Sequence, residues 1–315
     1  MARAELPLTR SVWTATPAGQ PQARVRLLGD AIVFACPGMR NTTQRHAATL
    51  LCSTDGQALQ ARCQGHTVQA PALLIAPMAC KTVDALDRPL LLIDLEPGHP
   101  HYRHFQALAA PGVQALHGAP CAALQDLGRA FAAGRLQGQA VDAQVREAVA
   151  AVAHQLPQPK PLDPRVRKLM CLLDEDPGAE LERLAPLLGL SAHHASRLFH
   201  QGLGLPLRRY ALSIKIRAAA SFMGSGLALT QIAQAAGFVD SAHFAKVWAQ
   251  NYGAAPSRFF DTANTHIDQT DQPDWLLWYL AQRDRDLPPP APGAQTPWVH
   301  RRRTPRTPRL RTAAP

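Results

Sequence analysis

The spacing of hydrophobic residues changes about a third of the way along this 315-residue chain. Up to about residue 96, short apolar runs alternate with turn residues such as Asp55-Gly56 and Pro71. Short runs at such intervals predict the strands of a small all-β unit. The expected strands include residues 31–34, 47–51, 72–75 and 90–93.

Beyond this unit, apolar residues recur at helical spacing, which predicts helices over about 101–109, 118–133 and 139–155. The last of these helices carries a stripe of valines. Such a stripe either packs into the core of its own chain or forms a contact between two subunits, and the spacing leaves both open. The stripe consists of Val141, Val145, Val149 and Val152.

Two later stretches share one layout, about fifty residues apart. Residues 184–191 are followed by 196–199 and Gly204, and residues 232–241 are followed by 245–248 and Gly253. Each copy predicts a short helix, a tight turn with a glycine, and an amphipathic second helix. This is the pattern of a helix-turn-helix, whose second helix can enter a major groove of DNA.

Individual positions of both copies fit this pattern. Gly189 and Gly237 stand where the first helix of each copy must stop, and glycine tolerates the left-handed backbone found there. Ser191 can cap the next helix in the first copy, and Asp240 or Ser241 can do so in the second. The residues expected to pack inward are Leu190, Leu198, Phe199, Phe238, Phe244, Val247 and Trp248.

The outward residues of the two second helices are candidates for contact with DNA. For a single helix, a merely solvated face is the alternative, and the repetition of the motif favours DNA binding. The candidates are His193, Ser196, Arg197 and His200 in the first copy, and Ser241, Ala242, Lys246 and Gln250 in the second.

Residues 163–260 resemble the AraC family of bacterial transcription regulators. The most specific segment runs from Ile232-Ala233 through Gly237-Phe238 and 241–244 to 253–258. The chain departs from the family pattern in its first copy, where Ala195 replaces a leucine and Pro186 lies late in the first helix. Both departures predict a looser first motif. Smaller departures are Ala242, Trp248 and Phe260.

The resemblance implies an α+β chain. An N-terminal cupin-like β-barrel with helices would cover residues 1–156, for sensing or dimerisation, followed by a linker over 157–162. An all-α domain of two helix-turn-helix motifs, joined by a long helix over 207–223, would cover 163–260 and begin at the capping pair Asp163-Pro164. The remainder, 261–315, is expected to form a short helix at 274–283 and a basic, disordered tail.

The charge of the chain changes this picture little. The formal net charge is +10, and residues 160–260 hold 12 Lys and Arg against 7 Asp and Glu. This excess fits contact with phosphates, and it equally fits an arginine-rich protein from a GC-rich genome. Two other functions stay open: an architectural, weakly specific DNA-binding protein, and a cupin-like enzyme with a helical appendage. The enzyme requires a clustered acid, base or metal set within residues 20–100, and the sequence offers none.

We expect neither a catalytic metal nor a cofactor. The paired histidines, Glu and later His of metal-binding cupins are absent, and His99, His101 and His104 are expected to be solvated. Six scattered cysteines without a C-x-x-C pair are expected to be buried thiols. Neither a signal peptide nor an apolar run long enough for a spanning helix is visible, so we expect a cytoplasmic protein without membrane contact.

Together these patterns predict a transcription regulator that is not an enzyme. The tandem motif would bind operator double-stranded DNA in successive major grooves. The N-terminal domain would bind a small-molecule effector or mediate homodimerisation, and RNA polymerase is a further candidate partner. The sequence leaves the effector, the target genes and the direction of regulation open.

Overall fold

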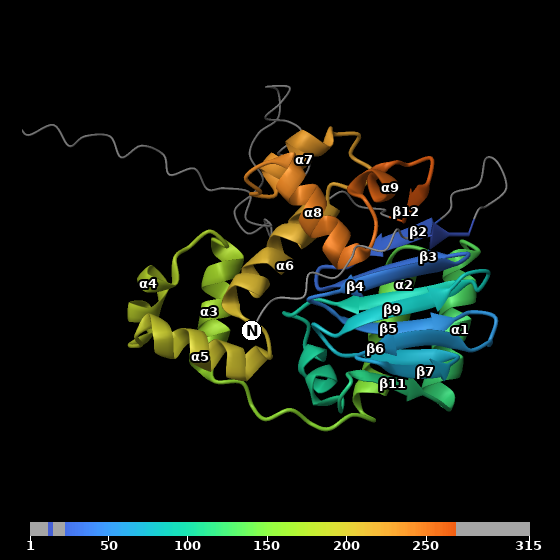
Figure 1. Ribbon diagram of the computed structural model, residues 1–315, viewed down its shortest axis with the longest axis horizontal. Helices are drawn as coiled ribbons and strands as arrows, with labels where there is room; N and C mark the ends of the chain where they lie inside the picture. The colour runs from blue at the N-terminus through green and yellow to red at the C-terminus, as the bar shows by residue number, and fades with distance from the viewer. Residues whose placement is uncertain (1–11, 15–22, 269–315) are drawn as a thin grey trace, which may run out of the picture.

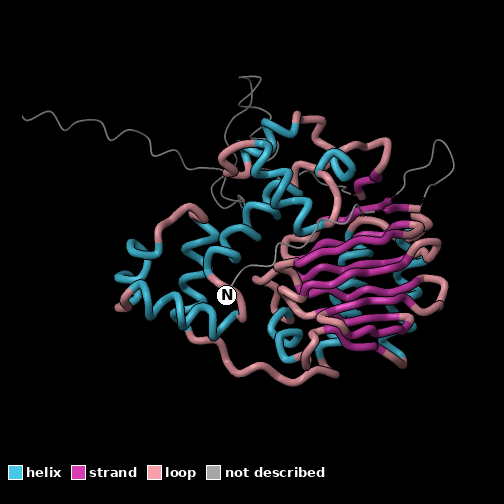
Figure 2. Tube along the Cα trace, viewed as in Figure 1, coloured by secondary structure: helices cyan, strands magenta, loops and turns pink. Residues whose placement is uncertain are grey.

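The computed structural model describes residues 12–14 and 23–268 of the chain (Figure 1). The expected α+β organisation is present: all described strands except β12 precede the helical part, and Figure 2 shows the strands gathered on the right, with helices behind them and to the left. The expected helix at 274–283 and the basic tail lie outside the described residues.

The strands form two sheets, whose neighbours run antiparallel except for β12 and β2, which are parallel. The first sheet has the order β1-β4-β9-β6-β7, with bounds Val12–Trp13, Met39–Gln44, Cys80–Ala85, Leu59–Cys63 and His66–Ala70. The second has the order β11-β8-β5-β10-β3-β2-β12, with bounds Val113–Leu116, Ala72–Ile75, Ala48–Ser53, Leu90–Leu95, Ala31–Cys36, Ala23–Leu27 and Thr265–Ile267.

The seven-stranded sheet is covered on both faces. Its strands β3, β5 and β10 are buried at every position. One face packs against the five-stranded sheet, and the other packs against helices. This double burial explains why these strands read as continuous apolar runs, whereas β4 and β9, with one face toward solvent, alternate between buried and more exposed residues.

Helices form the third layer. The helix α1 (Ala119–Ala132) packs against the seven-stranded sheet, and α2 (Gln139–Ala153) packs against α1. All four valines of the α2 stripe are buried within the single chain. The stripe therefore belongs to the core of its own domain and offers no surface to a second subunit.

The expectation of solvated histidines before these helices is wrong. The segment forms a short 3-10 helix, η1 (Tyr102–Ala107), whose Tyr102 and Phe105 lie in the core. This packing draws the neighbouring rings inward, so that His99 and His104 are buried. His101 lies between them, with ring centroids 5.7 and 5.4 Å away.

The extended linker over 157–162 leads into the helical part. The carboxylate of Asp163 accepts a hydrogen bond from the Arg165 amide at 2.8 Å, which confirms the predicted cap. The helices and turns that follow are α3 (Pro164–Glu175), α4 (Leu181–Leu184), η2 (Ala185–Leu188), α5 (Ala192–Leu203), α6 (Leu207–Ala220), α7 (Leu229–Ala235), α8 (Ser241–Tyr252) and α9 (Pro256–Phe260).

The two sheets do not close into the expected barrel. Instead, α8 lies against β4, and α9 lies against β12 at the edge of the other sheet (Figure 1). Phe34 and Met39 of the sheets share one apolar cluster with Trp248 and Phe259 of these helices. The second helix-turn-helix thus completes the core of the N-terminal domain, because it covers apolar side chains that a closed barrel would cover with strands.

The chain also returns to the N-terminal domain after α9. Residues 261–268 were expected to belong to a separate tail, but β12 pairs with β2 inside this segment. The carboxylate of Asp268 then accepts a hydrogen bond from the Gly138 amide at 3.1 Å. Such pairing over more than 200 residues has no local signal in the sequence.

Candidate nucleic-acid interface

The first helix-turn-helix consists of α4, η2 and α5. Pro186 is the second residue of η2, and the first helix of the motif ends there as a 3-10 turn. Because proline lacks an amide hydrogen and its ring obstructs the preceding turn, this irregularity follows from the sequence. Gly189 has a φ of 67°, and the Leu190 amide donates to the Ala185 carbonyl at 3.1 Å to close the turn.

The second helix-turn-helix, α7 and α8, repeats this turn with different residues. Gly237 has a φ of 76°, and the Phe238 amide donates to the Ala233 carbonyl at 2.9 Å. The two recognition helices, α5 and α8, also begin alike. The Ser191 hydroxyl accepts from the His194 amide at 3.3 Å, and the Asp240 carboxylate accepts from the His243 amide at 2.6 Å.

The recognition helices have the same length, 12 residues each. Arg197 and Lys246 are both the sixth residue of their helix, so the two cations occupy equivalent positions. Of the eight candidate residues, Ser241 is partly buried at the start of α8. The exposed ones are His193, Ser196, Arg197 and His200 on α5, and Ala242, Lys246 and Gln250 on α8.

The helix α6 joins the two motifs. Its 14 residues span about 21 Å at about 1.5 Å per residue. Tyr210 and Ile214 are buried on its inner side, and the Tyr210 hydroxyl donates to the Asp174 carboxylate of α3 at 3.1 Å. The connector is therefore anchored by packing and is not a flexible linker.

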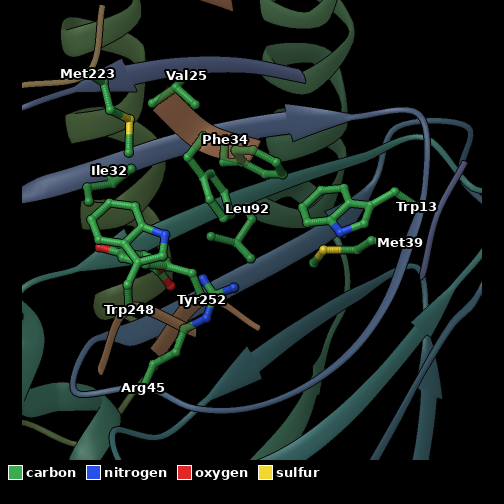
Figure 3. Close-up of a pocket in the computed structure, with 12 residues that line it drawn as sticks. Trp13, Val25, Ile32, Phe34, Met39, Arg45, Leu92, Met223, Trp248 and Tyr252 are labelled. Atoms are coloured by element: carbon green, nitrogen blue, oxygen red, sulfur yellow. The ribbon is translucent and has the colours of Figure 1, made fainter. Parts of the chain in front are cut away.

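A small, mostly apolar pocket lies between the sheets and the second motif (Figure 3). In that view, the indoles of Trp13 and Trp248 lie on opposite sides of it, and Arg45 lies at its lower edge. The lining is mostly apolar, and it draws on both halves of the chain. It comprises Trp13, Val25, Ile32, Phe34, Met39, Arg45, Leu92, Asp94, Met223, Trp248, Tyr252 and Phe259.

Arg45 and Asp94 are the charged residues of this lining. They form a buried ion pair, and Asp94 also accepts a hydrogen bond from the Thr49 hydroxyl at 2.5 Å. The guanidinium carbon of Arg45 lies 5.6 Å from the ring centroid of Tyr252, on α8. The pair therefore connects the interior of the sheets with the recognition helix.

A second, polar pocket, smaller than the first, lies where the N-terminal domain meets α6 and α8. It is lined by His46, Ala47, Glu96, Ser213, Ile216 and Asn251. Burial lowers the pKa of His46 to about 4 and raises the pKa of Glu96 to about 7, because burial disfavours the charged form of each. Near neutral pH the imidazole is therefore uncharged.

Sequence reasoning missed the residues of the N-terminal domain that touch the DNA-binding part. Asn41 is one of these: it is polar yet occupies a buried position in the alternating strand β4. A polar residue on the apolar side of an alternating strand is a usable signal, because such a group needs a partner. For Gln106, which is partly exposed on η1, the sequence gives no comparable signal.

Within residues 12–14 and 23–268, no group of three or more His, Cys, Asp or Glu side chains is placed to hold a metal ion. None of the helices in the same ranges is long and apolar enough to cross a membrane.

Comparison with known proteins agrees with this geometry. A family model described as a helix-turn-helix domain matches residues 184–262, which run from the end of α4 to just beyond α9. No curated protein matches the sequence.

Two similar solved structures are of ToxT from Vibrio cholerae. The first, an apo form of ToxT, has a TM-score of 0.53 at 12% identity and covers 75% of this chain and 98% of the other. The second, ToxT with a bound unsaturated fatty acid, has a TM-score of 0.50 at 11% identity and covers 74% and 95%. The shared fold spans both the sheets and the helical part. The resemblance to the AraC family is thus supported in two ways: residues 184–262 match a helix-turn-helix domain, and the chain shares the fold of ToxT.

Proposed function

We propose that the protein reads operator DNA with both recognition helices and that its N-terminal domain senses a small molecule. The observation that carries the first part is the duplication of turn, cap and helix length, which places Arg197 and Lys246 at equivalent exposed positions. The proposed division is residues 1–156 for sensing, 157–162 as linker and 163–260 for DNA binding.

The proposal predicts that Arg197 and Lys246 each contact a base of the operator. An arginine or lysine that pairs with a guanine edge discriminates against other bases by about 1–3 kcal/mol. We therefore expect Arg197→Ala to relax base preference in one half of the site, and Lys246→Ala to relax it in the other half. Binding constants for duplexes substituted base by base, measured at one salt concentration, give this result directly.

A matched control is Arg135→Ala, which removes the same charge from an exposed position of the N-terminal domain. This variant should leave base preference unchanged. If Arg197→Ala or Lys246→Ala weakens all duplexes by the same factor, that side chain contacts phosphate and the proposed base contact is wrong.

The sensing part of the proposal rests on the pocket between the sheets and α8. Its mostly apolar walls favour a compact, largely apolar effector. Trp248, Tyr252 and Phe259 line it from the DNA-binding part, so a bound molecule would contact the recognition helix itself. The bound fatty acid in the similar ToxT structure supports an apolar effector.

An apolar fluorescent probe, N-phenyl-1-naphthylamine, tests this site. We expect micromolar binding with energy transfer from tryptophan, and loss of binding in Met223→Trp, because the larger ring fills the pocket. Met170→Trp, on α3 and outside the pocket lining, is the control and should bind normally. Equal binding by both folded variants would place the probe elsewhere and contradict the proposed site.

A further inference from the structure

Both recognition helices end on amide side chains of the N-terminal domain. The carbonyl of Leu203, the last residue of α5, accepts a hydrogen bond from the Gln106 Nε2 on η1. The carbonyl of Tyr252, the last residue of α8, accepts one from the Asn41 Nδ2 on β4 at 3.4 Å. The two contacts therefore meet equivalent atoms of the repeated motif, although they come from different elements.

The glycines that follow the two helices lie equally close to these amides. Gly204 and Gly253 have φ values of 67° and 78°. A Cβ added to Gly204 would lie 3.1 Å from the Gln106 Nε2, and one added to Gly253 would lie 3.0 Å from the Asn41 Cβ. Each helix end thus approaches the N-terminal domain so closely that an added Cβ would press on the side chain of Gln106 or Asn41.

An arginine of the N-terminal domain accompanies each amide. Arg103 donates from its Nε to the Gly202 carbonyl of α5 at 2.9 Å, and Arg45 lies over the ring of Tyr252 on α8. The last carbonyls of a helix lack partners within the helix and carry partial negative charge. The two amide donors and the Arg103 guanidinium therefore stabilise the docked position, and Arg45 adds a cation–π contact at the end of α8.

These contacts leave the proposed DNA-reading residues uncovered. The docked ends are the carboxyl ends of the helices, whereas Arg197 and Lys246 lie at mid-helix and are exposed. The N-terminal domain thus holds both recognition helices without blocking them. In Figure 1, α8 approaches β4 with its end, and α6 runs between the two motifs.

We propose that Gln106 and Asn41 are positioning residues for DNA recognition, and that they fix the placement of the two recognition helices relative to each other. The proposal rests on the reading of DNA by both helices. A single connector such as α6 fixes the distance between the motifs. Attachment of each motif at a second point, on one rigid domain, also restricts their rotation about α6.

The test measures how strictly the protein requires one spacing of its two half-contacts. Duplexes selected by the full-length protein from a random library serve as the probe, together with versions that carry one inserted base pair between the half-contacts. One base pair adds about 3.4 Å and about a tenth of a turn. We expect the wild type to lose at least tenfold in affinity on this insertion.

Gln106→Glu keeps the size of the side chain and replaces the donor by an acceptor. We expect it to bind the original duplex about fivefold more weakly, since one hydrogen bond contributes about that factor. For this variant, one inserted base pair should weaken binding threefold or less. Asn41→Ala removes the contact at the end of α8 and should show the same two changes in affinity. Gln69→Ala, which removes an exposed amide on β7, should bind both duplexes as the wild type does.

The ratio of affinities for the two duplexes separates positioning from general destabilisation, because a partly unfolded protein loses affinity for both duplexes equally. An unchanged ratio in Gln106→Glu, with a wild-type melting curve, would overturn the positioning role while leaving two-helix reading intact. If Asn41→Ala does not fold, the half-exposed Gln106 decides the result alone. A wild type that tolerates the insertion would contradict the reading by two helices and, with it, this inference.

Discussion

Inserting five base pairs between the two half-contacts of the operator should reduce binding to the non-specific level. Five base pairs rotate one half-contact by about half a turn of B-DNA, to the opposite face of the duplex. Specific complexes are typically about 10³–10⁷ times tighter than non-specific ones, so we expect a loss of at least about a thousandfold. Gel-shift titration at fixed salt, with a random duplex as reference, measures this loss.

The physical reason is the rigidity of the connection. The 14 residues of α6 span about 21 Å, and the bulk of a motif at each end can bring the recognition helices to about 34 Å, one turn of DNA. An insertion of ten base pairs is the informative control. This insertion returns the second half-contact to the same face of the duplex, but it doubles the distance between the two half-contacts. A rigid protein should therefore not bind this duplex specifically either. Recovery of affinity at ten base pairs would contradict a rigid placement.

Asp94→Ala should destabilise the protein by about 3–5 kcal/mol, since it leaves the Arg45 guanidinium buried without its counterion. The side chains of this pair are 6% and 2% exposed, and the change also removes the acceptor of the Thr49 hydroxyl. Urea unfolding followed by circular dichroism gives the free energy of unfolding.

The ion pair of Arg40 and Asp84 provides the control on the outer side of the sheet. Its side chains are 51% and 38% exposed, and its N–O distance is 2.7 Å. Asp84→Ala should leave the free energy of unfolding close to that of the wild type, because water screens an exposed pair. Should Asp94→Ala not fold, Asp94→Asn preserves the shape and is expected to lose less. Similar losses for the two positions would show that burial of the Arg45 pair contributes nothing.

The prediction of the tandem motif succeeded because its signals are local. Turn glycines, helix caps and helical periodicity depend on residues within a few positions of one another, and Gly189, Ser191, Gly237 and Asp240 were all identified in this way. The irregular first helix followed from Pro186 for the same reason. The buried strands β3, β5, β8 and β10 were found because burial on both faces makes them uniformly apolar.

The sequence by itself therefore determined the most deeply buried strands, the duplicated motif and most of the exposed residues of both recognition helices. It could not determine which surfaces of the N-terminal domain those helices contact. The pairing of β12 with β2, the closure of the sheets by α8 and α9, and the burial of His99 and His104 all join segments far apart in the chain. Such contacts depend on the complementary shape and polarity of two distant surfaces, and only the tertiary structure brings those surfaces together.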